Sequence, residues 1–252
     1  MTPSTRTVQQ VSPAPLSGLR VAVTGGTSGL GLALVETAIA RGARVALVAR
    51  TRDRVDQVTR TLRGARGVVG DVSRQDDIYP IALQLAAALG GLDVLVNNAS
   101  SLGRVPLAPL ADTACEDLEA ALATNLLGPF RLTKAVLGSL TASARDGRGG
   151  LVVNISSDAA VTPYEGWGAY GASKAALLHL TRIWSAEVAA LGVQMVSFDP
   201  GDMDTPLHAA ALPDADRSLL KRPAASAHAL CDLIATQLAR RQPAGDATAA
   251  RR

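Results

Sequence analysis

The fold of this chain is decided by the stretch Thr24-Gly25-Gly26-Thr27-Ser28-Gly29-Leu30-Gly31. The short apolar run Arg20–Thr24 precedes it, and a segment of helical pattern, Gly29–Arg41, grows out of it. Glycines at such a point let the backbone turn tightly and approach another group closely. A strand, a glycine turn and a helix in this order predict the first unit of a parallel α/β sheet.

The same alternation continues to residue 199. Short β-branched runs predict strands at Arg20–Thr24, Arg44–Ala49, Gly67–Val69, Asp93–Asn97, Leu151–Ile155 and Gln194–Phe198. Longer periodic segments predict helices at Gly29–Arg41, Arg52–Leu62, Arg74–Leu89, Cys115–Leu140 and Tyr170–Leu191. Right-handed crossovers then give an α/β fold, a doubly wound parallel sheet with helices on both faces.

The ends of the chain differ from its middle. Residues 1–17 are rich in Thr, Ser, Pro and Gln and predict a disordered lead-in, and residues 241–252 predict a flexible tail. A last helix is expected at about Ala224–Arg240, with no β-branched segment after it. No interior linker is visible, so we expect one domain over residues 18–240.

Composition excludes several classes of protein. The chain has 252 residues, 48% of them apolar and 19% charged, as expected of a globular protein. Its formal charge of +3 comes from scattered arginines, so we expect no nucleic-acid partner. Cys115 and Cys231 lack metal-ligand spacing, and we expect buried thiols, no metal site and a reducing, cytoplasmic location. No signal peptide or membrane span is predicted.

The glycine stretch also predicts a binding site for a dinucleotide. A pyrophosphate would lie on the helix N-terminus, because the backbone amides there are free and the glycines allow close approach. The contributing residues would be Gly25, Thr27, Ser28, Gly29, Leu30 and Gly31. Asp71 and Val72, after the third strand, would meet the adenine. The alternatives are a plain strand-to-helix turn and, for Asp71, a helix cap.

Arg50 indicates which dinucleotide is bound. An NAD site places a carboxylate at the end of the second strand, whereas an NADP site offers arginine to the 2′-phosphate. This strand ends Val48-Ala49-Arg50, with Thr51 or Arg52 able to assist. We therefore predict NADP(H) in preference to NAD(H). The alternative is an arginine that is merely exposed.

Tyr170-Gly171-Ala172-Ser173-Lys174 places a phenol and an ammonium one helical turn apart. A free tyrosine has a pKa of about 10, and a nearby cation favours its phenolate. The pair is therefore a candidate for proton transfer. For the spacing alone, the alternative is a surface tyrosine and a solvated lysine.

Together these motifs resemble the short-chain dehydrogenase/reductase family, which has the Rossmann fold. The glycine run matches the family's T-G-x-x-x-G-x-G pattern, and Tyr170 to Lys174 matches its Y-x-x-x-K. Two further elements are similar: Asn97-Asn98-Ala99 to N-N-A-G, and Pro200-Gly201, with Met203 and Thr205, to the P-G element. The resemblance covers roughly residues 18 to 240 and implies an NAD(P)-dependent enzyme that oxidises alcohols or reduces carbonyls.

The resemblance also implies four catalytic residues. They are Asn125, Ser157, Tyr170 and Lys174, with Ser156 as the fallback for the serine. Tyr170 would be the general acid or base, Ser157 would hydrogen-bond the substrate oxygen, and Lys174 would lower the pKa of Tyr170 and hold the nicotinamide ribose. Asn125 would anchor a water chain.

Two departures from the family pattern concern the backbone and the assembly. Ser100 stands where the family's N-N-A-G ends in glycine, close to the expected nicotinamide. No candidate exists for the family's usual seventh strand, which often lies at a subunit interface. We therefore expect a homodimer, formed through the long helices around Asn125 and Tyr170, rather than a tetramer.

A third departure is the presence of acids on the substrate side. Asp158 follows the catalytic serine, and Asp199, Asp202 and Asp204 surround Pro200-Gly201. One hypothesis is an acidic pocket for an amine-bearing or polyhydroxylated small molecule. The alternative is that these acids cap helices or pair with arginine. Tyr164, Trp167 and His208 are further candidates for the substrate wall.

Three functions remain open from the sequence. The first is an NADP(H)-dependent oxidoreductase that transfers a hydride between nicotinamide and a carbonyl or secondary alcohol. The second is a non-catalytic NADP-binding regulatory protein, since fold alone does not prove chemistry. The third is an isomerase or epimerase that uses the same site.

Overall fold

The computed structural model describes residues 16–240, and the expectations for residues 1–15 and 241–252 lie outside this range. Leu16 is fully buried, and its amide donates a hydrogen bond to the Arg41 carbonyl. Leu16, which falls within the predicted lead-in of residues 1–17, thus belongs to the core.

The described residues form one parallel sheet in the order β3-β2-β1-β4-β5-β6, which confirms the predicted doubly wound fold. The strands are β1 (Arg20–Thr24), β2 (Arg44–Ala49), β3 (Ala65–Val69), β4 (Val94–Asn97), β5 (Leu151–Ile155) and β6 (Gln194–Phe198). No seventh strand pairs with β6 within residues 16–240, as predicted. The order reverses between β1 and β4, where sheets of this kind open a crevice for ligands.

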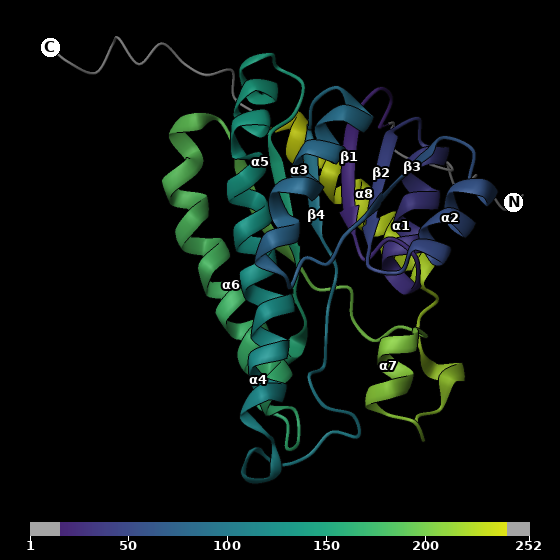
Figure 1. Ribbon diagram of the computed structural model, residues 1–252, viewed down its shortest axis with the longest axis vertical. Coiled ribbons are helices and arrows are strands. Elements are labelled where there is room, and N and C mark those ends of the chain that lie inside the picture. Colours follow the sequence, from purple (N-terminus) through teal and green to yellow (C-terminus); the bar gives the residue numbers. More distant parts are fainter. Residues whose placement is uncertain (1–15, 241–252) are drawn as a thin grey trace, which may run out of the picture.

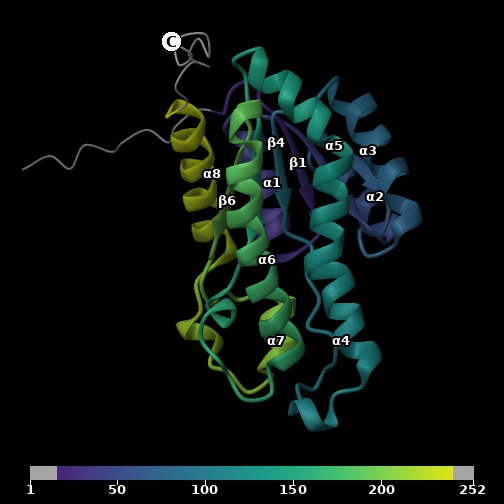
Figure 2. The ribbon, with the colours of Figure 1, turned by 90° about the vertical axis from the view of Figure 1, so that its left-hand side faces the viewer.

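Helices cover both faces of the sheet, as Figure 2 shows. They are α1 (Gly29–Ala40), α2 (Arg52–Thr61), α3 (Gln75–Leu89), α4 (Cys115–Leu122), α5 (Gly128–Arg145), α6 (Gly168–Val188), α7 (Pro206–Ala211) and α8 (Pro223–Ala239). One apolar core joins the strands to α1 and α8, and a second joins them to α3 and α5. Because both faces are buried, β1, β4 and β5 are mainly apolar along their length and do not alternate with exposed polar residues.

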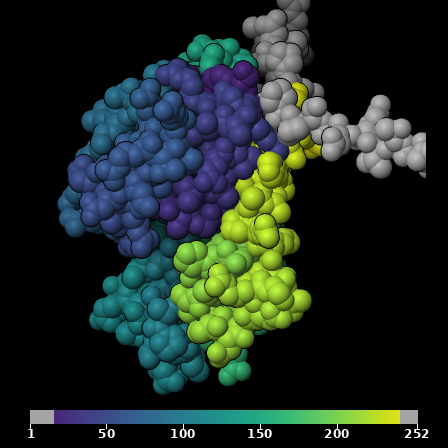
Figure 3. Space-filling model, turned by 90° about the vertical axis from the view of Figure 1, so that its right-hand side faces the viewer, coloured from purple at the N-terminus to yellow at the C-terminus, as the bar shows by residue number. Residues whose placement is uncertain are grey.

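The carboxyl ends of the strands point toward the lower part of Figure 1. There α4 and the adjoining ends of α5 and α6 stand on one side, and α7 stands on the other. Figure 3 shows the yellow-green segment around α7 below the purple and blue first half of the chain. Short turns complete this edge at Leu110–Asp112, Asp158–Ala160 and Arg217–Leu219, whereas Ala189–Leu191 leads into β6 at the opposite edge.

A wide turn interrupts the predicted helix Cys115–Leu140. The segment Ala123–Leu127 is a π-helical turn between α4 and α5, and α5 continues to Arg145. Pro129 explains the interruption, since it has no amide hydrogen to donate to the preceding turn. Such wide turns are frequent at functional sites, and this one carries Asn125.

Two other expectations need correction. Cys115 is exposed at the start of α4, whereas Cys231 is buried as predicted. Helix α7, between Thr205 and the last helix, was not predicted at all. Within residues 16–240, no helix has both the length and the apolar composition needed to cross a membrane.

Buried polar side chains fix the helices that carry the site to the strands. The Asn97 amide donates hydrogen bonds to Asn154 Oδ1 at 2.8 Å and to Thr133 of α5 at 3.2 Å. The Asn154 amide in turn donates to Thr181 of α6 at 2.8 Å. Because unpaired buried amides are costly, this ladder favours one placement of α5 and α6 on β4 and β5.

Candidate active site

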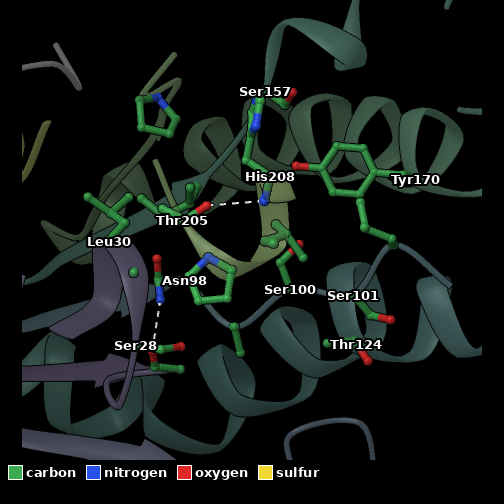
Figure 4. Close-up of a pocket in the computed structure, with 18 of the residues that line it drawn as sticks. Ser28, Leu30, Asn98, Ser100, Ser101, Thr124, Ser157, Tyr170, Thr205 and His208 are labelled. Atoms are coloured by element: carbon green, nitrogen blue, oxygen red, sulfur yellow. Dashed lines mark hydrogen bonds between the residues drawn. The ribbon is translucent and has the colours of Figure 1, made fainter. Parts of the chain in front are cut away.

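A single cavity of about 810 Å³ runs along the carboxyl edge of the sheet. Its cofactor half lies over the ends of β1, β2 and β3, and its substrate half lies over the ends of β4, β5 and β6, beside α7. Figure 4 shows Ser28, Leu30 and Asn98 on one side of the cavity and Tyr170 and Ser157 on the other. All of the predicted site residues except Gly31 and Asn125 line this cavity.

The glycine turn requires its glycines. Gly25 and Gly29 have φ angles of +68° and +52°, in the left-handed region that disfavours other residues. A Cβ on Gly25 would lie 2.9 Å from the Ala99 Cα, and one on Gly31 would collide with the Gly25 carbonyl oxygen. The Asn98 amide holds the turn by donating to the Thr24 carbonyl at 2.8 Å.

The start of α1 is suited to an anion. Ser28 is the N-cap residue but its side chain makes no capping hydrogen bond, and the first turn of the helix has no acidic residue. Free backbone amides and the positive end of the helix dipole favour a phosphate here. Thr27 and Leu30 line the same part of the cavity. These residues fit the pyrophosphate of a dinucleotide.

The far end of the cofactor half contains Arg50, Arg54, Asp71 and Val72. The Arg50 side chain is 75% exposed and lies 3.9 Å from Asp71, too far for a strong ion pair. Its guanidinium is therefore available to a phosphate. Arg54, in the first turn of α2, also lines the cavity, whereas Arg52 borders a separate hollow against α2 and β3.

Asp71 has local partners. Its carboxylate accepts hydrogen bonds from the Ser73 amide at 2.9 Å and the Ser73 hydroxyl at 2.7 Å. The predicted alternative of a local capping role is therefore partly right, since Asp71 stabilises the turn before α3. Asp71 nevertheless borders the cavity beside Val72.

The segment after β6 closes the cavity over the glycine turn. Gly201 has a φ of +68°, and Pro200, Met203 and Thr205 line the wall. Thr205 is the N-cap of α7 and accepts a hydrogen bond from the His208 amide at 3.2 Å, drawn in Figure 4. A Cβ on Gly29 would lie 3.2 Å from the Thr205 methyl group, so the two segments nearly touch.

Lys174 is buried beside the ring of Tyr170. Its ammonium lies 5.5 Å from the centroid of the Tyr170 ring and donates a hydrogen bond to the Ile155 carbonyl at 2.8 Å. Burial lowers the pKa of Lys174 to about 8, and the charge of Asp199 opposes that shift. The lysine is thus mostly protonated at neutral pH, but at a cost in free energy.

The hydroxyl of Tyr170 points into the cavity, near Ser157 and Ser100 (Figure 4). Burial raises the pKa of Tyr170, while hydrogen bonds with Ser157 and Ser100 act in the opposite direction. The pKa of Tyr170 is therefore raised overall, whereas its helical spacing to Lys174 predicts a lowered pKa. The reason is that only 7% of Tyr170 is exposed, and burial disfavours a phenolate.

Ser157 and Tyr164 are both hydrogen-bonded to the Asp158 carboxylate. The Ser157 hydroxyl donates to Asp158 Oδ1 at 2.9 Å, and the Tyr164 hydroxyl donates to Asp158 Oδ2 at 2.7 Å. These hydrogen bonds, that from Tyr164 above all, lower the pKa of Asp158 despite its partial burial. An ionised carboxylate only accepts hydrogen bonds, so the single proton of Ser157 is directed at Asp158.

The side-chain amide of Asn125 is fully hydrogen-bonded to protein groups. Its amide nitrogen donates to the Ser101 carbonyl at 2.7 Å and to Ser173 Oγ at 2.8 Å. Its oxygen accepts from the Ser101 amide at 2.8 Å and the Ser100 hydroxyl at 3.1 Å. The side chain of Asn125 therefore has no free donor or acceptor for the water chain that the resemblance implies. Asn125 instead ties the loop after β4 to α6.

The remaining acids have different surroundings. Asp204 pairs with Arg217 at 2.6 Å, and Asp199 accepts a hydrogen bond from the Gly201 amide at 2.9 Å. Asp158 pairs with Ser157 and Tyr164 rather than with an arginine. Asp202 lines the mouth of the cavity. The predicted cluster is thus divided among separate local roles, which weakens the hypothesis of one acidic pocket.

Several residues of the cavity escaped the sequence analysis. Arg54 could have been found from its place in the first turn of the predicted helix Arg52–Leu62, close to Arg50. Ser100 was noted only as a departure from glycine, although its hydroxyl lies between Asn125 and Tyr170. Leu102 and Leu207 carry no motif, and only the folded chain brings them to the substrate half.

Comparison with known proteins agrees with this geometry. The family model described as short chain dehydrogenase matches residues 20–216. The chain belongs to the short-chain dehydrogenase/reductase family and is an oxidoreductase acting on CH-OH groups with a nicotinamide nucleotide. One relative is 2,5-dichloro-2,5-cyclohexadiene-1,4-diol dehydrogenase of Sphingobium indicum. It is 33% identical over 196 residues, which are 76% of this chain and 75% of that protein.

Solved structures share the fold. A short chain dehydrogenase from Shigella flexneri, complexed with NADP, is 25% identical with a TM-score of 0.81 over 89% of this chain and 93% of that one. A 3-ketoacyl-(acyl-carrier-protein) reductase from Brucella melitensis, complexed with NADH, is 22% identical, also with a TM-score of 0.81. That alignment covers 89% of this chain and 94% of the other, and it shows the likeness of fold alone.

The buried charge of Lys174 leads to a prediction about stability. Its pKa is about 8 in the folded protein and 10.5 when unfolded, so folding is penalised while both states are protonated. Lys174→Met should therefore raise the free energy of unfolding at pH 7 by about 1 to 3 kcal/mol. The gain should shrink as the pH rises from 8 toward 10.5, where the lysine becomes neutral in both states.

Urea unfolding of both proteins across this pH range measures the effect. Lys134→Met, on the exposed side of α5, is the matched control and should change stability little at any pH. A Lys174→Met protein that is less stable than wild type at pH 7 would contradict the assignment of a costly buried ammonium.

Proposed function

We propose that this enzyme transfers a hydride between NADP(H) and a carbonyl or secondary alcohol of a small molecule, with Tyr170 as the general acid and base. The observation that carries the proposal is the meeting of three groups in one cavity: the Tyr170 hydroxyl, the Ser157 hydroxyl and the Lys174 ammonium. The uncapped start of α1 lies in the same cavity. We also propose that residues 16–240 form a single catalytic domain.

When bound, the nicotinamide supplies or accepts the hydride. In the direction of reduction, Tyr170 donates its proton to the substrate oxygen. Its raised pKa keeps the hydroxyl protonated until that moment. Lys174, 5.5 Å from the ring centroid, then stabilises the phenolate that remains.

Ser157 stabilises the reacting oxygen in both directions, because oxidation and reduction pass through the same transition state. Its hydroxyl donates to Asp158 in this structure, so it must turn away from Asp158 to donate to the substrate oxygen, whose own proton is exchanged with Tyr170. Asn125 supports both directions by holding the Ser100–Ser101 loop against α6.

The central test is the loss of turnover when the Tyr170 hydroxyl is removed. Tyr170→Phe keeps the ring but has no proton to transfer, so kcat/KM should fall by about 10² to 10⁴. The measurement is NADPH consumption with a panel of aldehydes and ketones, alongside NADPH binding by fluorescence. Unchanged turnover in Tyr170→Phe would contradict the mechanism. If both proteins bound NADPH but neither reacted, a regulatory role would be favoured.

Arg50 supports a preference for NADP(H). Its exposed guanidinium lies at the end of β2, whose last residue is Ala49 rather than an acid, and Arg54 lines the same region. Two arginines in reach of one phosphate suit a nucleotide with a 2′-phosphate.

Arg50→Ala should therefore raise the KM for NADPH by about tenfold, while the KM for NADH stays within about twofold. Arg52→Ala is the matched control, because Arg52 borders the hollow on the other side of α2. Steady-state kinetics with both nucleotides measure the change. Equal affinity of the wild type for NADPH and NADH would sink the preference.

We further propose that the enzyme is a homodimer that pairs through α5 and α6. Leu127, Phe130 and Ile183 expose 38%, 37% and 46% of their surface on these helices, and Phe130 packs on Trp184. Such apolar side chains favour a protein partner.

Phe130→Asp places a charge in this surface and should convert the dimer into a monomer. Sedimentation velocity of both proteins at equal concentration measures the mass. Lys134→Asp, on the exposed part of α5, tests whether any added carboxylate has the same effect. A wild-type protein that sediments as a monomer would contradict the proposed assembly.

A further inference from the structure

Aromatic side chains are scarce in this chain but concentrated in the substrate half of the cavity. The sequence has only two Phe, two Trp and three Tyr. Tyr164, Trp167 and Tyr170 all line the cavity. The other tryptophan, Trp184, packs against Phe130 on the outer face of α5 and α6. The gathering at the site therefore does not follow from composition.

The three rings form a continuous series from the mouth to the reacting hydroxyl. The centroids of Tyr164 and Trp167 are 6.3 Å apart, and those of Trp167 and Tyr170 are 5.7 Å apart in an edge-to-face arrangement. Exposure falls from 45% at Tyr164 to 7% at Tyr170, with Trp167 half-buried between them. Rings at such separations provide faces and edges for another flat ring.

The wall around this series is apolar. Leu102, Ala159 and Ala211 form a small core cluster with Tyr170, and Leu107, Trp167 and Leu207 pack against it. These side chains come from the loop after β4, the turn after β5 and α7. A ligand beside Trp167 would therefore be enclosed by hydrocarbon groups.

The charges of the substrate half discriminate against ionised ligands. Both oxygens of Asp158 accept hydrogen bonds from Ser157 and Tyr164, so this acid anchors the wall of the substrate half. Asp202, at the mouth, repels anions. Among the described residues of the substrate half, no lysine or arginine is available to a carboxylate, since Lys174 is bound to the Ile155 carbonyl.

We infer that the substrate is an uncharged carbonyl compound or alcohol with a flat apolar ring, aromatic or alicyclic, which packs against Trp167 with its oxygen toward Tyr170. Keto acids, sugars and aliphatic amino ketones are disfavoured by the same wall. This inference rests on the proposed hydride transfer, and it narrows the class of molecule that the site accepts.

Four ketones test the inference by turnover in the presence of NADPH. Acetophenone carries the ring, and 2-octanone is the open-chain methyl ketone with the same number of carbons. Their kcat/KM values should differ by about tenfold in favour of acetophenone. The analogues 4-acetylbenzoate and 4-(aminomethyl)acetophenone add one charge of either sign, and the anion should lose about a hundredfold. A cationic ketone that exceeds acetophenone would overturn the inference in favour of an acidic pocket.

The two tryptophans provide a matched pair of variants. Trp167→Leu should reduce kcat/KM for acetophenone about tenfold more than for 2-octanone, while NADPH affinity stays within about twofold. Trp184→Leu makes the same change outside the cavity and should not alter the ratio between the two ketones. Equal losses for both ketones in Trp167→Leu would overturn the inference, because they indicate general damage rather than a ring site.

Ligand binding without turnover separates this inference from the proposed function. In a Trp184→Phe protein, Trp167 is the only tryptophan, and its fluorescence should respond to 1-phenylethanol at about tenfold lower concentration than to 2-octanol. This response without any NADPH oxidation would support the ring site and count against hydride transfer. Ketone reduction with no such preference would keep hydride transfer and reject the ring site.

Discussion

The hydrogen bond from the buried Lys174 ammonium to the Ile155 carbonyl is the interaction on which the site depends. It joins α6 to the last residue of β5, and Ser157 follows only two residues later. Tyr170 lies one helical turn before the lysine, so the same contact places the phenol against the serine. A buried ammonium needs such a partner, because burial already lowers its pKa to about 8.

A second buried junction sets the opposite wall. The side chain of Asn125 uses all of its donors and acceptors to hold the Ser100–Ser101 loop against Ser173 of α6. The π-helical turn before Pro129 gives this asparagine its place. Ser100, a departure from the family pattern, thereby becomes a neighbour of the Tyr170 hydroxyl. Its side chain occupies space in which the family pattern has only a glycine hydrogen.

Much of the fold could be predicted because the chain's pattern is regular. The six strands, their doubly wound arrangement and the glycine turn follow from β-branched runs, helical periodicity and glycine spacing. The π-helical turn could not be predicted, because one extra residue in a single turn hardly changes the spacing of apolar residues along a helix. Helix α7 is only six residues long, and such a short helix leaves little periodic signal.

The residues of the site could be predicted from the sequence, but their pKa shifts and hydrogen-bond partners could not. Spacing and resemblance pointed to Tyr170, Lys174, Ser157 and Asn125, and all four lie at or beside the cavity. The direction of the Tyr170 pKa depends on burial, which spacing alone does not reveal. The pairing of Asp158 with Tyr164 depends on the turn after β5, and Arg54 replaces Arg52 because of its position on α2.

The central claim, hydride transfer at Tyr170, is tested most directly by following the hydrogen itself. NADPH carrying deuterium at the transferable position of the nicotinamide should deliver one deuterium to the carbinol carbon of the alcohol product, as mass spectrometry would show. In Tyr170→Phe the labelled product should form at least about a hundredfold more slowly. A product alcohol without deuterium, or equal labelling rates in the two proteins, would contradict the account.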